Sequence, residues 1–191
     1  MKRAVLAVLA VLFLEAVLSL AIRAGGLVDV SAAGAPGALE TWFLGGTADH
    51  AIARLAQPIP AIDGSDADAL SEGLEHYNEM CVGCHAAPGR DDSEVARGLN
   101  PPAPHLWEQD TQDMSDAELF WVIKNGIRMT GMPAFGTTHP DEKIRDIVAM
   151  VRKLPDLKGD QYSQMVEAAG LGAPGGDDAD DDAPGHGEGE E

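Results

Sequence analysis

The sequence predicts an all-α domain, preceded by an apolar helix and followed by an acidic tail. Helix starts support the domain, because Ser65-Asp66 and the Ser115-Asp116-Ala117-Glu118 capping box each precede apolar residues at helical spacing. An apolar run over residues 4–22, broken only by Glu15 and Ser19, predicts the leading helix. From residue 172 onward the chain has only Gly, Ala, Pro, His and acidic residues, which cannot form a core.

Composition limits the kinds of partner that this chain binds. The 191 residues carry a net charge of −19, so nucleic acid and anionic membrane surfaces are poor partners, whereas basic protein faces are good ones. Aromatic residues make up only 5% of the chain, which is little for a self-sufficient core of this length. A buried cofactor would supply the missing apolar centre.

Residues 1–24 form a membrane anchor or a signal sequence. Lys2 and Arg3 precede the apolar run, which is long enough to span a bilayer and places the rest of the chain outside the cytoplasm. Ser19-Leu20-Ala21 has a small-x-small cleavage pattern, but we favour an uncleaved anchor. The expected location is the bacterial inner membrane facing the periplasm, or the soluble periplasm if the N-terminus is cleaved.

Residues 25–64 are predicted to be a linker with one short helix. Gly, Ala and Ser dominate its first half, and Thr47-Ala48-Asp49 marks a helix start that Pro58 ends. Trp42, Phe43 and Leu44 precede that helix and would serve either as an interfacial belt or as a packing surface for the folded domain. We expect packing.

Both cysteines of the chain lie in Cys81-Val82-Gly83-Cys84-His85. Two thiols at this spacing, followed at once by an imidazole, match covalent haem attachment, with His85 as an axial iron ligand. A structural zinc site would need further Cys or His pairs that the sequence lacks. A thiol-disulfide centre remains the alternative, although nothing upstream indicates the βαβ unit in which it usually occurs.

A second motif, Gly131-Met132-Pro133-Ala134-Phe135, offers a thioether as the other axial ligand. Pro133 forces Met132 into an extended conformation, so we prefer Met132 to Met129, with His139 or His105 as further alternatives. With these two motifs the chain resembles the class I c-type cytochromes, and the resemblance covers roughly residues 65–157.

The resemblance implies about four to five helices around one covalently bound haem c, in a domain that we place at residues 65–158. It also implies that the first and last helices of the domain cross near Gly73 and Tyr77. Arg145 and Met150 occupy positions where many relatives have aromatic residues, so this crossing is expected to be packed differently.

The Pro-rich loop over residues 86–114 is expected to wrap the haem. One carbonyl among Pro101, Pro102 and Pro104 should hold the second nitrogen of His85. In the same loop, Trp107 is expected to belong to the core.

Trp121 and Arg128 are candidate contacts to the haem propionates, as is Lys124. The alternatives are a core Trp121 with a backbone acceptor, and solvated side chains for the two cations.

The C-terminal extension, residues 159–191, is expected to be acidic and disordered from about residue 172. Its eight carboxylates leave a charge of −11 on the rest of the chain.

We expect a monohaem cytochrome that carries single electrons between respiratory-chain or dehydrogenase partners, alone or as a subunit of a larger oxidoreductase, and that is not itself an enzyme. A haem-binding sensor and a thiol-disulfide redox protein using Cys81 and Cys84 are the alternatives.

Overall fold

The computed structural model describes residues 1–26, 28 and 30–172, and within them every regular element is a helix. The predicted all-α class is therefore confirmed for the described residues. The chain divides into two compact units, Met1–Gly34 and Ala35–Glu191. Apart from Gly172, the predicted acidic tail lies outside the described residues.

The first unit contains helix α1, Lys2–Gly25. Among the described residues, α1 is the helix whose length and apolar composition suffice to cross a membrane, and a signal sequence would have the same properties. None of its side chains is buried, and Gly26 ends it in the left-handed conformation with φ of 60°.

The second unit opens with a continuous helical stretch, formed by α2 (Ala38–Glu40), the π-helix η1 (Thr41–Gly45) and α3 (Gly46–Leu55). It starts well before the predicted Thr47, because Ala38, Leu39 and Glu40 favour helix once Pro36-Gly37 has been passed. Ile52 on α3 is buried, and α3 contacts α8. We therefore treat this stretch as part of the folded unit and not as a free linker.

The expected packing of Trp42, Phe43 and Leu44 against the domain is wrong, because all three side chains are exposed. Residues nearer the C-terminal end of the stretch pack instead: Ala48 is half-buried and Ile52 is buried.

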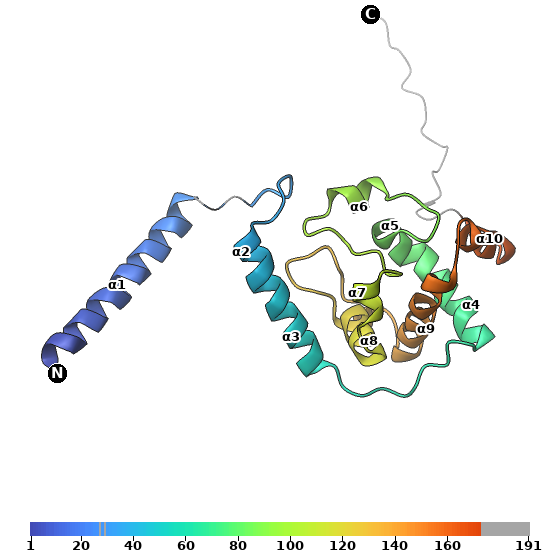
Figure 1. The fold of residues 1–191 in the computed structure, drawn as a ribbon, viewed down its shortest axis with the longest axis horizontal. Helices are drawn as coiled ribbons and strands as arrows, with labels where there is room; N and C mark the ends of the chain where they lie inside the picture. The colour runs from blue at the N-terminus through green and yellow to red at the C-terminus, as the bar shows by residue number, and fades with distance from the viewer. Residues whose placement is uncertain (27, 29, 173–191) are drawn as a thin grey trace, which may run out of the picture. The chain divides into compact units, whose positions relative to one another are not determined.

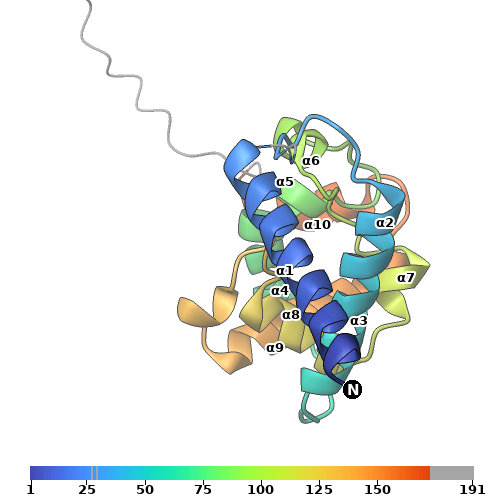
Figure 2. The same cartoon turned by 90° about the vertical axis from the view of Figure 1, so that its left-hand side faces the viewer.

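The first helix of the domain proper runs without interruption from α4 (Ala67–His76) through η2 (Tyr77–Cys81) into α5 (Val82–His85). Asp66 caps it by accepting from the backbone N–H groups of Asp68 and Ala69. The remaining helical elements are α6 (Glu94–Gly98), α7 (Gln109–Gln112), α8 (Asp116–Asn125), η3 (Phe135–Thr137), α9 (Asp141–Lys153), η4 (Leu154–Asp156) and α10 (Gln161–Ala168). Figures 1 and 2 show α6 at the opposite end of the domain from α8 and α9.

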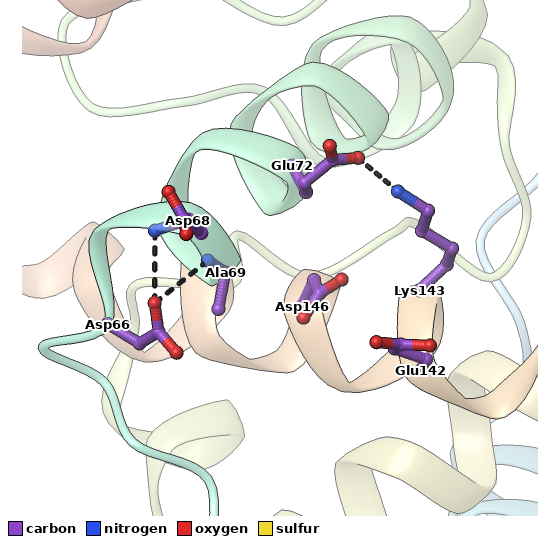
Figure 3. A pocket seen from close by; sticks show the side chains of 7 residues that line it. All are labelled: Asp66, Asp68, Ala69, Glu72, Glu142, Lys143 and Asp146. Carbon is purple, nitrogen blue, oxygen red and sulfur yellow. Dashed lines mark hydrogen bonds and ion pairs between the residues drawn. The ribbon is translucent and has the colours of Figure 1, made fainter.

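Helices α4 and α9 cross at Gly73, as predicted. A Cβ at Gly73 would overlap the carbonyl group of Asp146 and would lie 3.0 Å from Cβ of Met150. Only a residue without a side chain allows this approach. Beside the crossing, Lys143 of α9 forms an ion pair with Glu72 of α4 (Figure 3).

The packed core extends beyond the predicted domain end at residue 158. Tyr162 and Val166 of α10 are buried in the same cluster as Tyr77, and the two tyrosine rings meet edge to face at 5.9 Å. The hydroxyl of Tyr162 donates to Oδ1 of Asn78 over 3.2 Å. The first part of the C-terminal extension is thus a structural element of the domain.

Candidate functional site

Cys81 ends η2, and Cys84 and His85 lie in α5. Cys81 is buried and Cys84 is half-buried. Residues three and four apart on a helix are neighbours on its surface, so the spacing places both sulfurs and the imidazole on one face. The continuous helix from Ala67 onward therefore presents the whole motif on a rigid support.

The imidazole of His85 is fixed by the Pro-rich loop. Its Nδ1 lies 2.7 Å from the carbonyl oxygen of Pro104, which is one of the three predicted acceptors. Burial lowers the pKa of His85, so the ring is neutral. In the neutral ring, Nδ1–H donates to the carbonyl and Nε2 keeps its lone pair. This is the tautomer that a metal ligand requires.

Two further contacts fix the backbone around the motif. The hydroxyl of Tyr77 donates to the carbonyl of Ala86 over 2.8 Å, directly after His85, where Ala86 has φ of 53°. The hydroxyl of Ser93 donates to the carbonyl of Gly83, between the cysteines. The chain is therefore held on both sides of His85.

His105 has both of its ring nitrogens close to carboxylates. Nε2 lies 2.8 Å from Asp92 and Nδ1 lies 3.4 Å from Glu108. The hydrogen bond that His105 donates to Asp92 is the main cause of a raised pKa for His105. The ring also stacks on Trp107 at 4.5 Å, and Trp107 packs against the core as expected. These contacts leave His105 poorly suited to replace Met132 as an iron ligand.

Met132 lies in a loop that is closed by hydrogen bonds. The backbone N–H of Ile127 donates to the carbonyl of Met132 over 3.2 Å, and the N–H of Met132 donates to Oγ1 of Thr130 over 3.1 Å. Gly126, with φ of 65°, lies so close to this turn that a Cβ would be 2.7 Å from the carbonyl oxygen of Met132. The loop is therefore tightly constrained around Met132.

The structure distinguishes between the two methionines of this loop. Met132 is half-buried and packs against the core, whereas the Met129 side chain is 88% exposed. Next to Met132, a Cβ at Gly131 would meet the Leu99 side chain, so the Pro-rich loop and the methionine loop touch. These contacts favour Met132 as the ligand, and its role stays a prediction.

The predicted propionate contacts have different environments. Trp121 is half-buried on α8, and Arg128 is exposed. Lys124 forms an ion pair with Asp141 over 2.6 Å, which links α8 to the start of α9. Of the remaining alternative ligands, His139 has Nδ1 at 2.8 Å from the hydroxyl of Thr138.

The thiol chemistry of the site does not favour disulfide exchange. Burial, with a smaller effect of Cys84, raises the pKa of the Cys81 thiol to about 12. Reactive cysteines in exchange enzymes have lowered pKa values, because the thiolate is the nucleophile. Cys81 would stay protonated at neutral pH.

A pocket elsewhere on the domain is chemically unlike this site. It lies between the start of α4 and α9 and has a volume of about 380 Å³ (Figure 3). Its lining is almost entirely polar and acidic, formed by Asp66, Asp68, Ala69, Glu72, Glu142, Lys143 and Asp146. It contains no thiol, thioether or imidazole.

Apart from Pro104, the residues that support the site were not predicted from the sequence. Thr130 and Gly126 hold the Met132 turn, Ser93 holds the cysteine turn, and Leu99 joins the two loops. The contact of Thr130 could have been predicted from the sequence, because Thr hydroxyls commonly form hydrogen bonds with nearby backbone groups. Leu99 carries no such signal.

Comparison with known proteins places the motif in a family. Residues 68–151 match the family model described as cytochrome c oxidase, cbb3-type, subunit III, and the match includes both cysteines, His85 and Met132. No curated protein matches the chain. Among solved structures, the chain is similar to the c-type cytochrome XoxG from Methylobacterium extorquens AM1, with 15% identity over 74% of this chain and 96% of that one, and a TM-score of 0.36. At this level the structural likeness says nothing about site residues.

Proposed function

We propose that this chain, which residues 68–151 identify as a class I c-type cytochrome, carries single electrons. The carrier of the electron in this proposal is one covalently bound haem c. Electron transfer by a haem protein follows from the family. The single haem, its attachment through Cys81 and Cys84, and its ligation by His85 and Met132 are our proposals.

The observation that carries this proposal is the contact between His85 and Pro104. A neutral imidazole whose Nδ1–H is held by a carbonyl has one unshared electron pair left, on Nε2. His85 lies four residues after Cys81 and directly after Cys84 on the same continuous helix. Few groups other than a covalently attached haem use two sulfurs and an adjacent imidazole in this arrangement.

Each part of the chain has a defined task in this proposal. Cys81 and Cys84 would hold the porphyrin, and His85 and Met132 would hold the iron. When bound, the haem supplies reversible one-electron chemistry at its iron. The closed loop around Met132 keeps the thioether in place. The apolar core, which Phe135 and Leu106 adjoin, excludes water.

The constrained loop also favours an electron carrier over a haem sensor as the function of this chain. A sensor needs a labile position on the iron for its ligand, whereas the hydrogen bonds of Ile127 and Thr130 hold the turn that carries Met132. The raised pKa of Cys81 likewise disfavours a thiol-disulfide role.

We further propose that α1 tethers the domain to the bacterial inner membrane on its periplasmic side, and that the partners have basic docking faces. The apolar length of α1 and the positive residues Lys2 and Arg3 before it support the tether. The net charge of −19 supports the basic partners.

The test is to express the full chain with the haem-attachment machinery and measure haem retention on a denaturing gel. We expect wild type and the Met129→Ala control to keep the haem, and Cys81→Ser and Cys84→Ser to lose most of it. A pyridine haemochrome spectrum of the wild type checks the type of attachment. Wild-type protein without haem, or Cys84→Ser protein with normal haem content, would overturn the proposal.

A further inference from the structure

An apolar patch on the first helical stretch of the second unit has no part in the haem site. It consists of Leu39, Trp42, Phe43 and Leu44, whose side chains are 76%, 73%, 61% and 54% exposed. The rings of Trp42 and Phe43 lie 6.4 Å apart. Clustered exposed side chains of this size mark an interaction surface, since leaving them in water is unfavourable.

The domain itself does not cover the patch. The stretch packs through its C-terminal part, where Ile52 is buried and α3 contacts α8, and its N-terminal part is left exposed. Glu40 is the only charged residue between positions 31 and 48. A partner for this surface must therefore be recognised by apolar and aromatic contact, and not by charge.

The position of the patch in the chain identifies the surface that it meets. Helix α1 ends at Gly25, and residues 26–37 connect it to the patch. Twelve residues span at most about 40 Å when fully extended, so a chain anchored by α1 keeps the patch close to the membrane. Trp is among the residues that accumulate at membrane interfaces, and Phe and Leu form the apolar face of interfacial helices.

We propose that Leu39, Trp42, Phe43 and Leu44 insert into the lipid interface of the membrane that α1 crosses, as a second attachment. This inference rests on the proposed tether. Because α3 packs on the domain through Ile52, insertion of the patch also restricts how the haem domain turns above the membrane. The partner is a lipid surface, and the acidic chain makes a zwitterionic surface the suitable one.

The experiment uses the full haem-loaded chain in phosphatidylcholine vesicles, with a nitroxide label at an introduced cysteine. Phe43→Cys carries the label on the patch, and Trp42→Cys is a second position should the first variant not fold. Val95→Cys is the matched control, because Val95 is 62% exposed on α6. We measure how often the label collides with each of two reagents in the reduced protein. One is oxygen, which concentrates in lipid, and the other is a water-soluble nickel chelate.

We expect the label at position 43 to collide with the nickel chelate several-fold less than the label at position 95, and with oxygen more. If the chain floats with the vesicles but both labels are equally accessible to the nickel chelate, the inference is overturned. The proposed tether through α1 would still hold in that case. Shielding of position 43 from both reagents would also overturn it, because protein and not lipid would then cover the patch. A chain that does not float overturns tether and patch together, while its haem spectrum still tests electron carriage.

Discussion

At the scale of single residues, the candidate site depends on His85 and Met132, and hydrogen bonds to a backbone carbonyl and to a hydroxyl restrict their positions. Pro104 fixes the imidazole of His85, and Thr130 fixes the turn at Met132. Ligand identity and orientation are among the main means by which a protein sets the properties of a haem iron. Substitutions in these two regions should therefore change the spectrum before they change the fold.

The first prediction concerns the choice of methionine. Met132→Ala should abolish the weak near-infrared absorption of thioether ligated to ferric iron and should lower the midpoint potential, because a thioether favours the ferrous state. Met129→Ala should keep both, since Met129 is 88% exposed. Absorption spectra and potentiometric titration of the two variants provide the measurement. If Met129→Ala loses the band and Met132→Ala keeps it, the ligand assignment is wrong.

The second prediction is a pH dependence carried by His105. The hydrogen bond that His105 donates to Asp92 raises the pKa of His105 above its ordinary value of 6.5. A raised folded-state pKa means that the stabilising effect is complete below about pH 6.5 and is lost as the pH rises through the higher folded value. The effect is small, because the His105 side chain is 34% exposed and Asp92 is 44% exposed.

Denaturant unfolding over the range from acid to mildly alkaline pH measures this effect. His105→Gln should lose the part of the pH dependence centred near neutrality, and Asp92→Asn should reduce it. Wild-type stability that rises through this range, with no change in His105→Gln, would count against the assignment.

The candidate donors were named from the sequence and stay predictions, whereas apart from the Pro104 carbonyl the contacts that support them were not foreseen. The cysteines and His85 follow from their spacing, and Pro133 distinguishes Met132 from Met129. The contact between Leu99 and Gly131 joins two loops by shape alone, without a local motif, so only the folded chain reveals it.

At the scale of elements, the domain is built on the crossing of α4 and α9. Gly73 lies against the backbone of Asp146, and Ile144, Ile147, Val148 and Val151 form the buried face of α9. Met150 completes the contact, with its Cβ 3.0 Å from the Cβ position at Gly73. Gly73 in α4, which has no side chain, and the flexible Met150 in α9 thus meet at the crossing, and α9 contributes no aromatic residue there.

The third prediction tests that crossing. Gly73→Ala should destabilise the domain by about 1–3 kcal/mol, because the added methyl group forces the two backbones apart. The matched control is Gly98→Ala at the end of α6, where a Cβ meets nothing within 4 Å. That variant should be neutral or slightly stabilising, as Ala favours helix over Gly. Equal stability of the two variants in denaturant unfolding would mean that the crossing is not tightly packed.

The order and starts of the main helices were predictable because caps are local signals. Ser115 and Glu118 form the expected capping box, and Gly126 ends α8. The helix starting at Ala38 was missed, because its Gly-rich surroundings masked three good helix formers. The packing of α10 was also missed, since Tyr162 and Val166 bury against residues distant in sequence.

At the scale of the whole molecule, the negative charge of the chain is the basis for the proposed encounter with basic partners. The net charge of −19 includes eight carboxylates beyond Gly172, and −11 remains on the rest of the chain. Long-range attraction to a basic partner therefore has two sources, which ionic strength screens together.

The fourth prediction separates these sources. Deleting residues 173–191 should leave the spectrum and the potential unchanged and should remove only part of the salt dependence of electron transfer. Gly172 is kept, because its carbonyl accepts a hydrogen bond from Asn78 over 3.0 Å. Stopped-flow oxidation by a basic protein across a range of ionic strength measures the rates. Rates that rise with salt in both proteins would show that the productive partner is acidic.

The contact between Asn78 and Gly172 has a consequence for kinetics. Asn78 lies three residues before Cys81, so Gly172, the last described residue before the acidic tail, is held beside the helix that carries Cys81. Whatever course residues 173–191 take, a partner bound to their first carboxylates is confined to the neighbourhood of that helix. Such confinement acts as a raised effective concentration, which turns a second encounter into an intramolecular step. The tail would then increase the number of productive attempts per binding event, without adding a contact to the electron-transfer surface.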